Sequence, residues 1–264
     1  MTAGMLDRFG AASRARFEAA LRQRSLAQLE DVIGQIPPAR PFAARLTPQA
    51  GPLPRVVAEM KRSSPSAGPL RADYAPRRIA LGYARVGAAA LSVLTEPDGF
   101  GGDLSHLQQA RAAHLPILRK DFLVTPYQIA ESRVEGADAV LLIVALLPGP
   151  ALGLMLHAAR RYAIEALVEV HDEEELARAS GEGASLIGVN NRDLRTMTVS
   201  LETSLRLAPR LPRSAVAVAE SGIRSRSDLE RLAEAGYAAF LIGEALMRAD
   251  DPGDALWRLT RAEG

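Results

Sequence analysis

Two lysines stand apart in this 264-residue chain, because the other 30 of its 32 basic residues are arginines. A guanidinium has a pKa above about 12 and cannot donate a proton near neutral pH, whereas an ammonium group can do so when its pKa is lowered. Because lysine ammonium groups occur at two positions only, those two positions are where proton-transfer chemistry is expected. Lys61 and Lys120 are therefore the first candidates for catalytic groups.

Carboxyl and amide side chains occur at the ends of the same kind of short apolar segment. Glu59 precedes Lys61 by two positions, so in a strand the two side chains lie on one face. A single glutamate at a strand end is more often a structural ion-pair partner, and Glu59 with Lys61 fits that interpretation too. The recurrence of acid, base or amide groups at five such ends favours one shared site. Its candidate catalytic members are Glu59, Lys61, Lys120, Glu169, Asn190 and Glu220.

Eight short apolar segments form the frame for these groups. They begin near residues 55, 90, 116, 139, 166, 186, 215 and 238. Consecutive starts are 20 to 35 residues apart, and a plausible helix lies between each segment and the next. Strand, crossover helix and strand at this period form the βαβ unit of a parallel sheet. Eight units predict a (β/α)8 TIM barrel, an α/β fold whose site lies at the carboxyl ends of the strands. An open doubly wound sheet is the alternative, but no G-x-G-x-x-G follows the first strand.

The chain is expected to fold as one domain, with residues 1–48 as an N-terminal helical extension that covers the barrel formed by 49–264. Apolar residues recur at roughly helical spacing up to Pro37-Pro38, which predicts an amphipathic helix. The extension lacks the apolar run of a signal peptide, so a cytoplasmic location is expected. The 21 residues 139–159 carry no formal charge, but the sequence Pro148-Gly149-Pro150 interrupts them. We therefore expect a strand, a loop and a helix there, and no membrane span.

Composition argues against several classes of partner and cofactor. The net charge of +1 provides no field to hold a nucleic acid, and the absence of cysteine excludes disulfides and thiolate chemistry. The four histidines are scattered without carboxylate partners at ligand spacing, so no metal site is expected. Asp172 with Glu175 is interpreted as a capping box that begins a helix, without a functional role.

Glycines after the last two strands predict a phosphate site. Ser221-Gly222 follows the seventh strand, and Gly243-Glu244 follows the eighth and begins a short helix. Glycine lets backbone N–H groups approach an anion, and barrels often bind phosphate at this place. The carboxylate of Glu244 would repel a phosphate unless its side chain points away.

Seven ordered segments of the chain resemble the indole-3-glycerol phosphate synthase family over essentially the whole length. They are AEMKRSSPSAG (58–68), LTEPDGFGGDLSHL (94–107), LRKDFLVTPYQI (118–129), ALVEVHDEEEL (166–176), IGVNNRDLRT (187–196), AESGIRSRSDL (219–229) and LIGEALMR (241–248). The resemblance implies a lyase of tryptophan biosynthesis that needs no cofactor. Such an enzyme closes a pyrrole ring on 1-(2-carboxyphenylamino)-1-deoxyribulose 5-phosphate, with loss of carbon dioxide and water, to give indole-3-glycerol phosphate.

The same resemblance implies roles for the catalytic candidates. Lys120 would be the general acid of ring closure, and Lys61 would contact substrate anions and assist dehydration. Glu169 matches an acid/base carboxylate and Glu59 a supporting one, while Asn190 and Glu220 orient the substrate and the lysines. Desolvation beside charged neighbours can lower a lysine pKa toward neutrality, as acid catalysis favours.

Further positions match substrate contacts of the family. Ser64, Pro65 and Arg192 match groups near the anthranilate carboxylate, and Phe100, Phe122 and Leu142 would wall the ring. Two positions depart from many relatives, since Gly99 stands where a second aromatic residue is common and Glu244 where some members have serine. The expected substrate-binding residues are Ser64, Pro65, Phe100, Phe122, Leu142, Arg192, Leu194, Ser221, Gly222, Ile242, Gly243 and Glu244.

Two other functions stay open at this point. A buried lysine can act as the nucleophile of a Schiff-base aldolase on the same scaffold. A barrel can also bind a phosphorylated ligand without catalysis. The expected partner is a small phosphorylated substrate, with no nucleic acid and no membrane. A monomer is expected, with association with other tryptophan-pathway enzymes as a further option.

Overall fold

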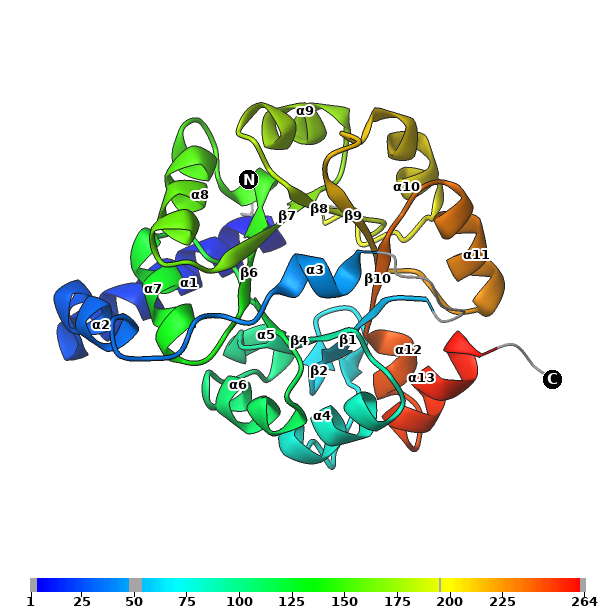
Figure 1. Ribbon diagram of the computed structural model, residues 1–264, viewed down its shortest axis with the longest axis horizontal. Coiled ribbons are helices and arrows are strands. Elements are labelled where there is room, and N and C mark those ends of the chain that lie inside the picture. Colours follow the sequence, from blue (N-terminus) through cyan, green and yellow to red (C-terminus); the bar gives the residue numbers. More distant parts are fainter. Residues whose placement is uncertain (1–3, 48–53, 195, 262–264) are drawn as a thin grey trace.

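Eight parallel strands close into a barrel in the computed structural model, which describes residues 4–47, 54–194 and 196–261 (Figure 1). Around the barrel the strands follow the order β1-β10-β9-β8-β7-β6-β5-β4. Each of the eight predicted segments contains one strand, so the predicted TIM barrel is confirmed. The strands are β1 (Val56–Met60), β4 (Ala90–Leu94), β5 (Ile117–Lys120), β6 (Ala139–Ile143), β7 (Glu165–Val170), β8 (Leu186–Asn190), β9 (Val216–Glu220) and β10 (Ala239–Ile242). A small hairpin of β2 (Ser63–Ser64) and β3 (Gly68–Pro69) lies in the loop after β1.

Helices surround the barrel and cover the outer faces of its strands (Figure 1). They are α4 (Pro76–Arg85), α6 (Ser105–Ala110), α7 (Pro126–Val134), α8 (Ala151–Arg161), α9 (Glu173–Gly181), α10 (Glu202–Leu207), α11 (Arg226–Glu234) and α13 (Pro252–Thr260). Two short helices, α5 (Pro97–Phe100) and α12 (Glu244–Met247), begin in the loops after β4 and β10. The described residues also include the 3₁₀ turns η1 (Arg111–Ala113), η2 (Val144–Leu146) and η3 (Ala208–Arg210).

Side chains alternate along each strand between this helical layer and the barrel interior. In β1, Ala58 and Met60 pack outward in the large apolar cluster beneath the helices, whereas Val57 belongs to a separate inner cluster. Met60 is fully buried on the outer side, so Glu59 and Lys61 point inward. In β6, Leu142 packs outward while Leu141 and Ile143 face inward.

The N-terminal extension is three helices rather than the single predicted helix: α1 (Met5–Gln23), α2 (Leu26–Ile33) and α3 (Phe42–Leu46). The first helix ends at Gln23 with Arg24 as its C-cap. Ser25 caps the second, because its Oγ accepts from the backbone N–H of Gln28 and the Gln28 side chain accepts from the N–H of Ser25. The predicted boundary between residues 48 and 49 lies outside the described residues.

The extension covers both ends of the barrel. α1 lies over the carboxyl ends of the strands, where Phe9 stacks on Phe122. α3 crosses the opposite end (Figure 1), where Phe42 and Leu46 are completely buried in the inner cluster. Because α3 packs apolar side chains into one end of the barrel, the cavity lies at the other end, where the strands have their carboxyl ends.

The uncharged stretch of residues 139–159 forms β6, a turn and α8, as predicted. Gly149 adopts a φ of 54° in that turn, a conformation that glycine tolerates without strain. Within the described ranges, no helix combines the length and the apolar character that a membrane crossing requires.

Candidate active site

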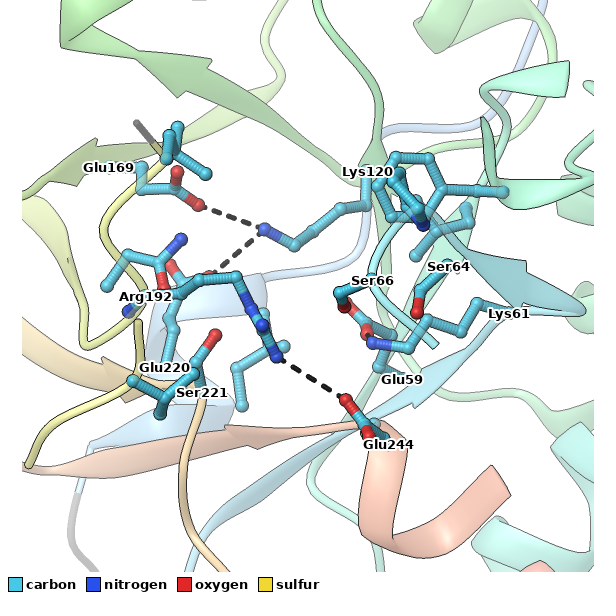
Figure 2. A pocket seen from close by; sticks show the side chains of 18 of the residues that line it. Glu59, Lys61, Ser64, Ser66, Lys120, Glu169, Arg192, Glu220, Ser221 and Glu244 are labelled. Carbon is cyan, nitrogen blue, oxygen red and sulfur yellow. Dashed lines mark hydrogen bonds and ion pairs between the residues drawn. The ribbon is translucent and has the colours of Figure 1, made fainter. Parts of the chain in front are cut away.

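A cavity of about 480 Å³ opens at the carboxyl ends of the strands. Every predicted site residue except Leu142 lines it, including all six catalytic candidates. Figure 2 shows Lys61 with Glu59 on one side of this cavity and Lys120 with Glu169 and Glu220 on the other. The barrel thus brings together side chains that lie up to 185 positions apart, between Glu59 and Glu244.

Lys120 lies between two carboxylates at the end of β5. Its Nζ is 3.0 Å from Oε2 of Glu169 and 3.1 Å from Oε2 of Glu220. Burial alone would lower the pKa of Lys120, but Glu169, Glu220 and the more distant Glu59 outweigh it and raise the pKa above the ordinary value. The pKa of Lys120 is thus raised rather than lowered toward neutrality, and Lys120 is held as an ammonium ion.

The two carboxylates beside Lys120 differ in their protonation. Burial opposes ionisation of Glu169, but the charges of Lys120 and His171 prevail and hold its pKa below the usual range. Burial raises the pKa of Glu220 to about 7, because Lys120 only partly compensates for the burial and for the negative charges of Glu169 and Glu59. Near neutral pH Glu169 is therefore ionised and Glu220 is partly protonated.

Two glycines make room for carboxyl groups in the cavity. A Cβ on Gly188 of β8 would lie 2.1 Å from Oε1 of Glu220, and a Cβ on Gly243 would lie 2.2 Å from Oε1 of Glu59. No side chain other than hydrogen fits at either position without moving a carboxylate. Gly243, predicted as a phosphate-loop residue, thus also determines where Glu59 can lie.

Lys61 forms a close ion pair with Glu59, since its Nζ lies 2.5 Å from the Oε1 atom of that residue. Both side chains are largely buried, with 13% and 4% of their surfaces exposed. The structural ion pair considered from the sequence is therefore present. Because both residues also line the cavity, the pair is available to a bound ligand.

Three aromatic rings wall one end of the cavity. Phe9 of α1 stacks on Phe122 with ring centroids 4.6 Å apart and nearly parallel planes, and Phe100 lies 5.8 Å from Phe9. A Cβ on Gly99 would lie 2.5 Å from Cζ of Phe9. The space beside Gly99, where a second aromatic residue is common in the family, is thus occupied by an aromatic ring from the N-terminal extension.

The expectation that Leu142 walls the ring was wrong by one position. Leu142 is fully buried beneath the outer helices, whereas Leu141 and Ile143 line the cavity. The alternation of side chains along β6 requires that neighbours point to opposite faces. The apolar wall in this strand is therefore formed by Leu141 and Ile143.

Arg192 and Glu244 face each other across the cavity, with Nη2 and Oε2 3.4 Å apart (Figure 2). Oε1 of Glu244 also pairs with Nε of Arg248 at 3.2 Å. The carboxylate of Glu244 is thus turned toward two guanidinium groups. Asn190 fixes the start of the same loop, because its Oδ1 accepts from the backbone N–H of Arg192 at 3.0 Å.

The loop after β9 has the backbone shape expected of an anion site. Ser221 and Gly222 have φ values of 64° and 81°. Successive residues of unusual conformation can turn backbone N–H groups toward a concave anion site. Both residues line the cavity, as do Gly243 and Glu244 at the start of α12.

Three functional candidates escaped the sequence analysis. Phe9 lies in the predicted N-terminal helix but was not assigned to the site. Arg16 of α1 contacts Asp121 at 3.1 Å and Glu96 at 3.4 Å, and so fastens the helix beside Lys120. His171 contacts Glu169 and Glu175, so the statement that the histidines lack carboxylate partners was wrong for it. The i, i+4 spacing of His171 and Glu175 was the signal in the sequence that could have revealed this contact.

Glu175 also explains why the predicted capping box is only half formed. Asp172 accepts from the backbone N–H of Glu175 and begins α9 as predicted. The carboxylate of Glu175 accepts from the backbone N–H of His171 and contacts its ring. In the part of the chain that the structure describes, no three histidine or acidic side chains are grouped as metal ligands would be.

Comparison with known proteins agrees with this geometry. The family model for indole-3-glycerol phosphate synthase matches residues 6–259. Indole-3-glycerol phosphate synthase 2 of Streptomyces coelicolor is 50% identical over 88% of this chain and 90% of its own length. Indole-3-glycerol phosphate synthase of Acidithiobacillus ferrooxidans is 48% identical over 89% of this chain and 90% of its own.

Solved structures of other proteins share the fold. 3-Hexulose-6-phosphate synthase from Salmonella typhimurium superposes with a TM-score of 0.61 at 12% identity, over 78% of this chain and 96% of that one. Thiamine phosphate pyrophosphorylase from Pyrococcus furiosus superposes with a TM-score of 0.57 at 18% identity, over 78% of this chain and 93% of that one. These likenesses concern the barrel alone, whereas the family match and the two close relatives extend over most of the chain. The chain therefore belongs to the indole-3-glycerol phosphate synthase family.

Proposed function

We propose that this protein converts 1-(2-carboxyphenylamino)-1-deoxyribulose 5-phosphate to indole-3-glycerol phosphate, with loss of carbon dioxide and water. The observation that carries the proposal is the position of Lys120, which is held as an ammonium ion by Glu169 and Glu220 inside the cavity. An aromatic wall lies at one end of that cavity. The guanidinium of Arg192 and the glycine-containing loop Ser221-Gly222 also line the cavity. These groups match the ring, the carboxylate and the phosphate of the substrate.

Ring closure needs a proton on the ketone oxygen as the anthranilate ring carbon attacks the ketone carbon. Lys120 donates this proton while the new carbon–carbon bond forms. The carboxylate then leaves as carbon dioxide, and the electrons of its bond restore the aromatic ring. Glu169 and Glu220 keep the ammonium group oriented at the cavity centre, and a positioned acid of this kind contributes about 10²–10⁴-fold to rate.

Dehydration needs a proton for the leaving hydroxyl group and a base that removes a proton from the ring. The Nζ atom of Lys61 lies 2.5 Å from Oε1 of Glu59, and the two residues can supply this acid and base as a pair. The ionised Glu169 is the other carboxylate available as a base. Asn190 orients the Arg192 loop, and Glu220 contacts Lys120 and helps to orient it.

Substrate anions are held at two places in this proposal. Arg192 binds the anthranilate carboxylate near Ser64 and Pro65, where a planar guanidinium suits a planar anion. Leu194 and Ile242 add apolar contacts. The phosphate is held by the backbone at Ser221-Gly222 and Gly243, with Glu244 directed to Arg192 until the substrate displaces it.

The proposed activity is tested with purified protein and the carboxyphenylamino-deoxyribulose phosphate. We expect a rise of indole fluorescence together with release of carbon dioxide. Absence of turnover at millimolar substrate would contradict the proposal. A Schiff-base aldolase needs a neutral amine as its nucleophile, and the raised pKa of Lys120 disfavours that role for Lys120.

Removing the charge of Glu244 is expected to improve substrate binding. In Glu244→Gln, Arg192 loses a competing carboxylate and the phosphate loses a repulsive neighbour. We expect KM to fall three- to tenfold while kcat changes less than twofold, as measured by steady-state kinetics at fixed ionic strength. Glu230→Gln is the control, because Glu230 is exposed on α11 and pairs with Arg226 there. An unchanged or increased KM in Glu244→Gln would contradict competition for Arg192.

We further propose that the protein works on this small phosphorylated substrate as a monomer in the cytoplasm, with association with other tryptophan-pathway enzymes as an option. The absence of cysteine suits a reducing compartment. The mass in solution, measured by light scattering, is expected to match the 28.2 kDa of one chain.

A further inference from the structure

His171 lies behind the catalytic cavity, in the loop between β7 and α9. Its Nε2 is 3.4 Å from Oε1 of Glu169, and its Nδ1 is 3.0 Å from Oε2 of Glu175. The same Oε2 accepts from the backbone N–H of His171 at 2.8 Å, which fixes the relative positions of the two residues. The Nδ1 contact is a hydrogen bond, whereas the Nε2 contact is an ion-pair distance, and buried Nε2 has no hydrogen-bond partner among the described residues. A neutral imidazole has only one N–H, so only the imidazolium form carries a hydrogen and positive charge toward both carboxylates.

The surroundings of His171 favour this charged form. The side chains of His171 and Glu169 are 14% and 2% exposed, so water screens their contact little. Burial lowers the pKa of His171, but its contacts with Glu169 and Glu175 outweigh burial and raise the pKa to about 10. These two carboxylates are the charged groups that face the ring, one from the strand and one from the helix.

Glu169 and Glu220, the two carboxylates that contact Lys120, therefore have different charged neighbours. Glu169 contacts two cations, Lys120 through one oxygen and His171 through the other. Glu220 contacts Lys120 through Oε2, while its buried Oε1 faces Gly188 and has no hydrogen-bond partner among the described residues. Its other charged neighbours, Glu169 and Glu59, are negative.

We propose that His171 is a positioning residue that keeps Glu169 ionised, so that a proton shared by the carboxylate pair resides on Glu220. The inference rests on the proposed function, because it assigns the states in which Lys120 and its neighbours meet the substrate. When Lys120 has given its proton to the ketone oxygen, the carboxyl proton of Glu220 can pass to Nζ over the 3.1 Å contact. Glu220 then becomes ionised and Lys120 is an ammonium ion again.

The pH dependence of kcat/KM tests this role in His171→Asn and His171→Gln. Without the imidazolium, ionisation of Glu169 requires a higher pH, so we expect the acidic limb of the profile to move upward by about one unit. A one-unit shift lowers kcat/KM by up to about tenfold at pH values below the limb and leaves it nearly unchanged at pH values well above the limb. A merely structural role would lower activity by the same factor at every pH.

Two further variants make the comparison sharper. Glu175→Gln removes one carboxylate from His171 and leaves the ring in place, so a smaller shift in the same direction is expected. His157→Asn is the matched control, because His157 is exposed on α8, and its profile should equal that of the unmodified protein. Thermal unfolding of each variant identifies any loss that is due to misfolding.

The protonation of His171 can also be measured directly in the unmodified protein. Nitrogen NMR of the imidazole should show both nitrogens protonated up to pH 8. A neutral His171 ring at pH 7, or a His171→Asn profile identical to the unmodified one, would overturn the proposal. Failure of the unmodified protein to turn over the substrate would instead refute the proposed function, and the NMR result would still decide the charge of His171.

Discussion

Lys120→Ala is expected to lower kcat by about 10³–10⁴-fold, the largest effect of any single substitution in this protein. The variant removes the ammonium group that lies 3.0 Å from Glu169 and 3.1 Å from Glu220, and no other lysine ends on that side of the cavity (Figure 2). Single-turnover measurements with the proposed substrate should show that the loss lies in ring closure. Affinity for inorganic phosphate should change less than threefold, because the loops after β9 and β10 are not altered.

Lys120→Arg separates proton donation from charge. Arginine keeps the positive charge between the two carboxylates but cannot release a proton near neutral pH. We therefore expect its kcat to be within about tenfold of that of Lys120→Ala. A Lys120→Arg variant with nearly full activity would show that Lys120 acts only by its charge. Retention of activity in Lys120→Ala would instead favour a binding module without catalysis at this residue.

The barrel and most of the cavity lining were predictable because they follow from periodic features of the sequence. The spacing of apolar segments determines the number of strands, and the carboxyl ends of parallel strands meet at one end of a barrel. Polar residues at those ends, such as Lys120 and Glu220, could then be assigned to one site without knowledge of distances. The uncharged residues 139–159 were interpreted correctly for a similar reason, since the prolines exclude a continuous helix.

The features that were missed depend on information that is not periodic. β6 reads AVLLI, and an entirely apolar strand has no polar alternation to show which side chains face inward, so Leu142 was assigned to the wrong face. The path of the N-terminal extension depends on the Ser25 cap and on the burial of Phe42 at the far end of the barrel. The raised pKa of Lys120 depends on carboxylates 49 and 100 positions away in the chain.

Gly188→Ala, a substitution in strand β8 of the barrel wall, is expected to lower kcat. The new methyl group would lie 2.1 Å from Oε1 of Glu220, so the carboxyl must move away from Lys120 or the strand must shift. A displacement of about 1 Å in a catalytic arrangement can cost about 10²-fold in rate, and we expect a loss of that size in kcat. Overpacking should also cost about 1–3 kcal/mol of stability, measured by denaturant unfolding.

Gly82→Ala is the matched control, because a Cβ on Gly82 in α4 meets nothing within 4 Å. Its activity should be unchanged, and its stability should rise by up to about 1 kcal/mol, since alanine favours the helix more than glycine does. A second comparison combines Gly188→Ala with Glu220→Asp, whose shorter side chain leaves room for the methyl group. The two changes should cost less together than the sum of their separate effects. Additive losses would show that the new methyl group acts on something other than Glu220, and the role assigned to Gly188 would then be wrong.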